Sequence, residues 1–161
     1  MKFEMTAPLE LGIACRDLPG LRRFYEECLD FTFVSEFVVP AEKSAAAAMS
    51  ADGYTVVRLQ TSFGERIKLL APNVPVAANP TPTYILDQPN AVYLTFIVAD
   101  ISAAITRLLE AGTEFMTGNE RVEVRPGVYL AFCRDPEGNI LELVEYEDIA
   151  SYRSDLQKRN D

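Results

Sequence analysis

Histidine is absent from the 161-residue sequence. Its absence removes the commonest metal ligand of proteins and the one side chain that ordinarily titrates close to neutral pH. An Fe(II) oxygenase site, which normally combines two histidines with a carboxylate, is therefore disfavoured. Acid–base chemistry in this chain has to come from carboxylates, lysine, tyrosine or cysteine. A metal ion would need carboxylate or phenolate oxygens as ligands.

Positive charge is also scarce. The chain has 15 lysines and arginines against 24 aspartates and glutamates, a formal net charge of −9. A nucleic-acid partner is therefore disfavoured, because phosphate binding requires a basic face. No apolar run approaches the roughly 18 residues of a membrane span, and the opening residues MKFEMTAPLELG lack the apolar region of a signal peptide. We expect no membrane partner and a cytoplasmic location.

Cysteine is limited to Cys15, Cys28 and Cys133. The number is odd, no pair has CxxC spacing, and each cysteine sits within an apolar pattern. These features indicate buried free thiols in a reducing compartment. A nucleophilic role for Cys133 is disfavoured because the sequence shows no partner that would activate its thiol.

Two segments of the chain are alike. Residues 9–18 (LELGIACRDL) and 92–101 (VYLTFIVADI) alternate apolar and smaller or polar residues, which is typical of a half-buried strand. Each contains an aspartate, Asp17 or Asp100, at an offset of 83 (100 − 17), placed to cap a following helix. Apolar residues at helical spacing follow both aspartates, and Gly112 predicts the end of the second helix.

Further strands are expected after each helix. They lie near 31–38, 54–61 and 65–71 in the first module, and near 113–117, 122–132 and 139–146 in the second. Residues 134–139 (RDPEGN) predict a hairpin turn, because proline fixes φ and glycine accepts a positive φ. Residues 41–50, which contain four consecutive alanines, predict a short helix or loose loop that only the first module has.

These elements predict one α+β domain over residues 1–161, built from two βαβββ modules. Module one spans 7–72, a proline-rich linker spans 72–90, module two spans 91–147, and a tail helix spans 148–161. The composition of the linker is typical of an extended surface segment. The sequence does not decide whether the linker is an interface or a flap.

Three motifs then carry a family resemblance. Residues 9–31 (LELGIACRDLPGLRRFYEECLDF) resemble the opening of a module of the vicinal oxygen chelate superfamily, which includes glyoxalases, bleomycin-resistance proteins and extradiol dioxygenases. Asp30 stands where that family usually has glycine. Residues 93–112 resemble the opening of a second module, and residues 134–145 (RDPEGNILELVE) resemble the closing hairpin. The resemblance implies paired, curled mixed sheets around a cleft and, usually, a homodimer.

Strand alternation predicts which side chains line the implied cleft. Gly12 has no side chain and Ala14 only a methyl group, so we expect them to leave space for a ligand beside the first strand. The predicted ligand-binding residues are Gly12, Ala14, Arg66, Thr95 and Tyr129, and Arg58 is a further candidate.

The resemblance also implies four metal-ligand positions, one on each of four strands, which commonly hold His or Gln, Glu, His and Glu. In this sequence the positions fall on Glu10, Lys68, Tyr93 and Glu142. Only Glu142 keeps the usual residue type, and a protonated lysine has no lone pair to donate to a metal. We therefore expect an ion cluster of Glu10, Lys68 and Glu142 without a cofactor. The alternative is a divalent metal such as Mg²⁺ or Mn²⁺ on Glu10, Tyr93 and Glu142.

Glu10, Lys68, Tyr93 and Glu142 are the candidate catalytic residues. A carboxylate that takes a proton from a carbon next to a carbonyl, with Lys68 or Tyr93 stabilising the enolate, predicts a metal-independent lyase or isomerase acting on a small oxygenated organic molecule. Two alternatives stay open. One is a non-catalytic protein that binds or sequesters a small molecule, as bleomycin-resistance proteins do, and the other is a metal-dependent lyase or dioxygenase.

Overall fold

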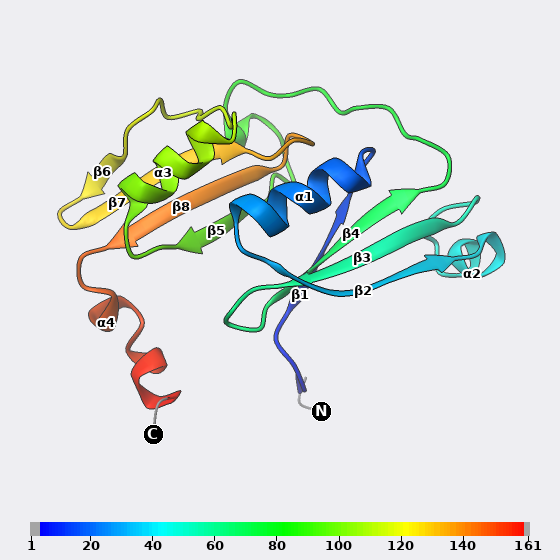
Figure 1. Ribbon diagram of the computed structural model, residues 1–161, viewed down its shortest axis with the longest axis horizontal. Coiled ribbons are helices and arrows are strands. Elements are labelled where there is room, and N and C mark those ends of the chain that lie inside the picture. Colours follow the sequence, from blue (N-terminus) through cyan, green and yellow to red (C-terminus); the bar gives the residue numbers. More distant parts are fainter. Residues whose placement is uncertain (1–3, 160–161) are drawn as a thin grey trace. The chain divides into compact units, whose positions relative to one another are not determined.

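A computed structural model describes residues 4–159 and divides the chain into two units, Met1–Pro80 and Thr81–Asp161. The first unit contains β1 (Glu10–Ala14), α1 (Leu18–Cys28), β2 (Thr32–Val39), α2 (Ala41–Ala46), β3 (Tyr54–Gln60) and β4 (Arg66–Pro72). Its four strands form one sheet in the order β1-β4-β3-β2, with β1 parallel to β4 and the other pairs antiparallel (Figure 1).

The second unit repeats this topology. It contains β5 (Tyr93–Ile97), α3 (Ile101–Glu110), β6 (Val122–Arg125), β7 (Val128–Arg134) and β8 (Ile140–Tyr146). Its strands form a sheet in the order β5-β8-β7-β6, again with the first pair parallel. The predicted α+β fold of two βαβββ modules is therefore confirmed. As expected, only module one has an additional helix, α2, between its second and third strands.

Both helices begin at the predicted aspartates. The Asp17 carboxylate accepts a hydrogen bond from Gly20 N at 3.0 Å, and the Asp100 carboxylate accepts one from Ala103 N at 2.9 Å. Each carboxylate pairs with an amide that has no partner within the helix. Past the two helix ends, Asp30 has a φ of 56° and Gly112 a φ of 84°. The glycine usual at the position of Asp30 fits this left-handed backbone.

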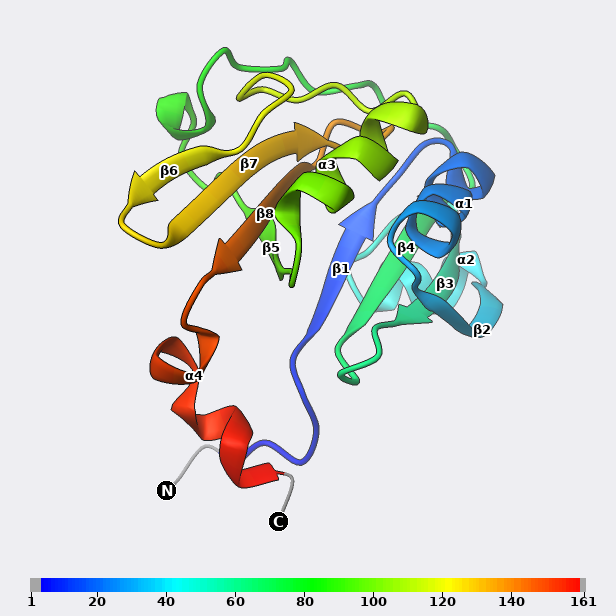
Figure 2. The ribbon, with the colours of Figure 1, turned by 60° about the vertical axis from the view of Figure 1, so that its left-hand side comes forward.

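One face of each sheet packs against the helix of its own module (Figure 2). The helix residues Leu21, Phe24, Tyr25, Ile101, Ile105 and Leu108 are buried. The sheet residues buried at positions predicted to face the helices are Ile13, Ile67, Leu69, Leu141 and Leu143. The structure places Val57, Leu59, Ala131 and Cys133 on the same sides and buries them as well. Burying a leucine, valine or isoleucine side chain of this kind contributes roughly 1.5–3 kcal/mol. Residues of the opposite parity lie on what we call the non-helix face of each sheet.

Two predicted strands of module two are wrong. Residues 113–117 form no strand and contribute only an isolated bridge between Phe115 and Cys133. Residues 122–132 do not form one strand, because Pro126 and Gly127 interrupt them and separate β6 from β7. Proline cannot donate a ladder hydrogen bond, and the φ of 73° at Gly127 closes a turn.

The turn between β7 and β8 forms at the predicted motif. Gly138 has a φ of 88°, and its amide donates to the Asp135 carbonyl at 3.0 Å. The Asp135 side chain is only 4% exposed. Its carboxylate accepts hydrogen bonds from Glu137 N at 2.9 Å, Asn139 N at 2.9 Å and Asn139 Nδ2 at 2.8 Å. The side chain thus satisfies the amides that the tight turn leaves unpaired.

The tail predicted as a helix over 148–161 contains two short segments, α4 (Ile149–Tyr152) and a 3-10 helix (Ser154–Arg159). Residues 160 and 161 lie outside the described residues. The rings of Tyr152 and Tyr146 stack with their centroids 4.0 Å apart, which joins α4 to the end of β8. Within residues 4–159, no helix has the length and apolar composition needed to span a bilayer.

Candidate functional site

Three charged residues gather on the non-helix face of module one. In the parallel pairing of β1 with β4, Glu10 is the register partner of Arg66, and Gly12 is the partner of Lys68. The Glu10 carboxylate lies 3.9 Å from Arg66 Nη1 and 4.0 Å from Lys68 Nζ. All three side chains are between 34% and 39% exposed. Of the predicted ion cluster of Glu10, Lys68 and Glu142, the structure brings Glu10 and Lys68 near each other and adds Arg66. The participation of Glu142 stays a prediction.

A third cation, Arg58, lies beside this group. Arg58 is the antiparallel partner of Lys68 across β3 and β4, and its guanidinium carbon lies 4.9 Å from the centre of the Phe37 ring. In the same pair of strands, Arg66 Nε donates to Gln60 Oε1 at 2.7 Å. The Gln60 contact orients Arg66, whereas Arg58 is held by an aromatic face that leaves its nitrogen atoms available.

Gly12 and Ala14 lie on the same face, and both are exposed. A Cβ atom at Gly12 would lie 3.3 Å from Leu70 Cδ1, so a side chain there would press on Leu70. Glycine therefore allows the Leu70 side chain to lie over β1. The expectation that these small residues leave room for a ligand stays a prediction.

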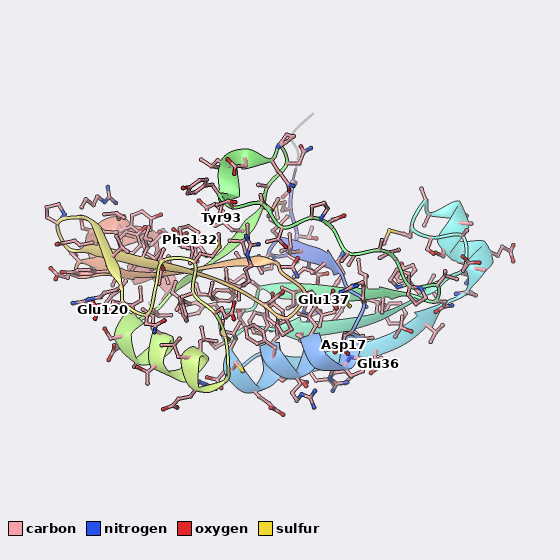
Figure 3. The ribbon with its side chains drawn as sticks, turned by 90° about the horizontal axis from the view of Figure 1, so that it is seen from above. Asp17, Glu36, Tyr93, Glu120, Phe132 and Glu137 are labelled. Carbon is pink, nitrogen blue, oxygen red and sulfur yellow. The ribbon has the colours of Figure 1, made fainter. Side chains whose placement is uncertain are left out.

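Module two has a different set of residues at the equivalent positions. Thr95 is the register partner of Glu142 across β5 and β8, and its hydroxyl donates to the Glu142 carboxylate at 2.6 Å. The Tyr93 ring packs edge-to-face on Phe132, with centroids 5.4 Å apart and an interplanar angle of 89° (Figure 3). The chemistry of this face is one oriented carboxylate beside an aromatic pair.

Register shows the correspondence between the modules. The pairs Gly12–Lys68 and Thr95–Glu142 occupy the same place in the two parallel ladders, and the same comparison aligns Glu10 with Tyr93. The residue opposite Lys68 on the third strand is Arg58, and the residue opposite Glu142 is Phe132. Phe132 was not predicted as a site residue, although its pairing through the closing hairpin would have placed it there.

Tyr129 does not lie with the other candidates, and its predicted place among them is wrong. It shares parity with the buried Ala131 and Cys133 and pairs with Glu145, so it lies on the helix side of the sheet. The Tyr129 hydroxyl donates to Glu147 at 3.1 Å, and Arg121 lies 3.8 Å from the ring centre. The hydrogen bond to Glu147 is the main cause of a raised pKa at Tyr129. The pairing of β7 with β8 through the closing hairpin sets this parity.

Cys133 is buried and has a raised pKa. Burial is the main cause and the charge of Asp135 the second, and together they raise the pKa of the thiol to about 12. Cys133 is therefore protonated near neutral pH and lacks the thiolate that a nucleophile or metal ligand requires. This agrees with the expectation of a buried free thiol.

The side chains at the four predicted metal-ligand positions do not fit a metal ion. An ammonium at Lys68 stands 4.0 Å from the Glu10 carboxylate, where it neutralises charge without offering a lone pair. The Glu142 carboxylate is engaged by Thr95. Within residues 4–159, no group of three or more histidines, cysteines, aspartates or glutamates is arranged to hold a metal.

Comparison with known proteins identifies the family of this arrangement. A family model described as the Glyoxalase/Bleomycin resistance protein/Dioxygenase superfamily matches residues 7–143, which is most of the chain. A search of the curated proteins finds no match.

Solved structures show the same fold at low sequence identity. A glyoxalase family protein from Bacillus cereus is 20% identical with a TM-score of 0.75, and the match covers 90% of this chain and 97% of that one. A glyoxylase/bleomycin resistance protein/dioxygenase domain from Frankia sp. is 18% identical with a TM-score of 0.67, over 90% and 95% of the two chains. A glyoxalase I variant from Zea mays is 18% identical with a TM-score of 0.64, over 86% of this chain and 44% of that one.

Proposed function

Because the chain belongs to the Glyoxalase/Bleomycin resistance protein/Dioxygenase superfamily, we propose that it is a metal-independent lyase or isomerase acting on a small oxygenated organic molecule. The observation that carries the proposal is the Glu10 carboxylate, which lies 4.0 Å from Lys68 Nζ on a sheet face that the helix of its own module does not cover. A base and an electrophile are thus adjacent on two paired strands.

The proposed chemistry is proton transfer at a carbon next to a carbonyl group. The Glu10 carboxylate accepts the proton, and negative charge develops on the carbonyl oxygen as the enolate forms. The Lys68 ammonium then stabilises that oxygen through charge and a donated hydrogen bond. Return of the proton to a different carbon gives an isomer, and departure of a group from the neighbouring carbon gives the product of a lyase.

Tyr93 and Glu142 are the further candidates in module two. The hydrogen bond from Thr95 keeps one oxygen of Glu142 in a defined position. The Tyr93 hydroxyl is a candidate proton donor, since the edge-to-face contact with Phe132 orients its ring and the side chain is 44% exposed. Their roles are part of the proposal and are tested separately from those of Glu10 and Lys68.

Exchange of carbon-bound hydrogen for solvent deuterium tests this function without knowledge of the product. Chelator-dialysed protein is incubated in D2O with hydroxyacetone, pyruvate and related hydroxyketones and oxo acids, and exchange is followed by proton NMR. We expect catalysed exchange that falls roughly 100-fold or more in Glu10→Gln, because general base catalysis contributes on that scale. Lys68→Met is expected to lower the rate while a compound that exchanges still binds.

Glu26→Gln is the matched control, since Glu26 also pairs with a cation, Arg22, but on the surface of α1 at 3.1 Å. It should exchange at the rate of the unmodified chain. Exchange that requires added divalent metal, or that continues at full rate in Glu10→Gln, would contradict the proposal. Elemental analysis of the same samples by plasma mass spectrometry checks for retained metal.

A second candidate function is non-catalytic capture of an apolar small molecule. It is favoured by the exposed apolar groups on the non-helix face of β5, where Tyr93 is 44% and Ile97 is 41% exposed. Absence of exchange with every compound, together with thermal stabilisation by apolar ligands that Glu10→Gln leaves unchanged, would select this function over the enzyme.

A further inference from the structure

Arg58 and Lys68 form a pair of like charges directly opposite each other across β3 and β4. Like charges at such cross-strand positions are destabilising, by a few tenths of a kcal/mol up to about 1 kcal/mol. The pair is unexpected in a chain with 24 acidic and 15 basic residues, where a carboxylate opposite Lys68 would be the ordinary arrangement. Stability alone therefore does not account for Arg58.

The neighbouring carboxylate does not neutralise this face. The charged residues on the non-helix face of β1, β2, β3 and β4 are Glu10, Arg58, Arg66 and Lys68. Three cations and one carboxylate give a local charge of +2. Glu10 lies near Arg66 and Lys68, and within residues 4–159 the side chain of Arg58 has no ion pair or hydrogen bond. The guanidinium that stacks on Phe37 therefore keeps its donors for an external acceptor.

On one side of Arg58 along the strands, away from Gln60, the residues of this face are apolar. Ala14, Val56 and Leu70 are aligned across β1, β3 and β4, and Phe37 pairs with Val56 from β2. Val56 is buried, so the accessible apolar surface is that of Ala14, Leu70 and Phe37. A molecule whose acidic group reaches Arg58 would thus meet aliphatic and aromatic surface with the remainder of its body. The combination of a planar cation and an apolar row suits an organic acid.

We propose that Arg58 binds the carboxylate of the substrate, so that the protein acts on a small organic carboxylate with an apolar body. The inference rests on the proposed function and narrows its substrate class. Arginine matches a carboxylate through two parallel N–H donors. A singly charged acid is favoured over a phosphate because Arg58 alone meets the acidic group, while Glu10 lies near Lys68 and Arg66. Lys68 remains available for the enolate oxygen.

The test compares each acid with its neutral amide. Isothermal titration calorimetry of the full chain uses benzoate against benzamide, hexanoate against hexanamide, and phenyl phosphate as the competing anion. We expect each carboxylate to bind roughly tenfold more tightly than its amide, as a charge-assisted hydrogen bond contributes. Arg58→Met should remove that preference by weakening carboxylate binding about tenfold, with amide binding unchanged. Arg58→Lys should restore part of it.

Arg22→Met is the control, because Arg22 also stacks on a phenylalanine, Phe33, at 4.5 Å but lies on α1. Its carboxylate preference should stay intact, and thermal denaturation checks that each variant folds. Equal affinity for acid and amide, no carboxylate binding, or an unchanged preference in Arg58→Met would each overturn the inference. Binding of phenyl phosphate without binding of benzoate would also overturn it.

The outcomes separate this inference from the proposed function. A carboxylate preference that depends on Arg58, combined with no hydrogen exchange for any compound, would reject the enzyme and keep the carboxylate site. Exchange limited to neutral hydroxyketones would keep the enzyme and reject the carboxylate site.

Discussion

The non-helix faces of the two modules carry different chemistry at equivalent positions. Where module one has Glu10 on its first strand, module two has Tyr93. On the strand that pairs in parallel with the first one, the positive Lys68 of module one corresponds to the negative Glu142 of module two. The register partner of Lys68 on β3 is Arg58, and the register partner of Glu142 on β7 is Phe132. Module one is thus suited to binding an anion, and module two to an apolar or aromatic group.

The helix faces show no such divergence. Both are lined by buried aliphatic residues, such as Leu59 and Leu69 in module one and Leu141 and Leu143 in module two. Packing against α1 or α3 requires apolar residues at alternate strand positions. The other parity is released from that requirement, so it can differ between two copies of one fold without loss of the core. The candidate site residues therefore lie on one parity of each strand, while most buried aliphatic residues lie on the other; Val56, Ile140 and Val144 are buried residues on the non-helix face.

The largest difference in stability between the modules is expected at their closing turns. Asp135 in module two is buried and accepts three hydrogen bonds, whereas Thr61 at the matching position is half-buried and bonds the exposed Glu65. Asp135→Ala should lower the free energy of unfolding by about 3 kcal/mol, because buried amides lose their acceptor. Thr61→Ala should lower it by less than about 1 kcal/mol.

Urea denaturation followed by circular dichroism measures both values. Asp135→Asn keeps one acceptor oxygen, so its free energy of unfolding should lie between those of Asp135→Ala and the unmodified chain. Equal losses of unfolding free energy in Asp135→Ala and Thr61→Ala would show that the two closing turns contribute equally to stability. The expected difference between the modules would then be wrong.

A smaller difference is expected at the third strands. Phe132→Ala removes the edge-to-face partner of Tyr93, and we expect a loss of about 2 kcal/mol because the ring is half-buried. Arg58→Ala should leave the free energy of unfolding within about 0.5 kcal/mol of its original value, because relief of the repulsion from Lys68 offsets the lost contact with Phe37. Paired thermal melts in low salt measure the two changes. A loss above about 2 kcal/mol at Arg58 would assign that residue to stability and weaken its role as a carboxylate anchor.

Local sequence rules are sufficient for most of the fold. Capping by Asp17 and Asp100, strand alternation and the turn at Gly138 each depend on a few neighbouring residues, and the structure confirms all three. The strands of module two are predicted less well. Pro126 and Gly127 lie inside an alternating pattern that continues on both sides, so periodicity alone does not reveal the break.

The candidate site follows from the sequence only in part. Parity and family resemblance bring Glu10, Arg66 and Lys68 to one face, as the structure shows. The pairing of Phe132 with Glu142 and the side of Tyr129 follow from the register of the closing hairpin rather than from the alternating pattern of residues 122–132. The bonds from Arg66 to Gln60 and from Thr95 to Glu142 depend on side-chain conformation across strands, which a linear pattern does not contain.

The smallest expected difference lies past the helix ends, where Asp30 and Gly112 both have positive φ angles of 56° and 84°. A side chain in this left-handed region is strained, and no atom lies within 4 Å of a Cβ at Gly112, so backbone conformation alone decides the effect there. Asp30→Gly should raise the free energy of unfolding by about 0.5 kcal/mol, the gain from relieved strain being partly offset by greater freedom of the unfolded chain. Gly112→Asp should lower it by about 1 kcal/mol. Urea denaturation of both variants measures the pair of values. A loss of stability in Asp30→Gly would mean that contacts of the Asp30 side chain outweigh its backbone strain. Side-chain contacts would then decide stability past the helix end of module one, whereas backbone conformation decides it in module two.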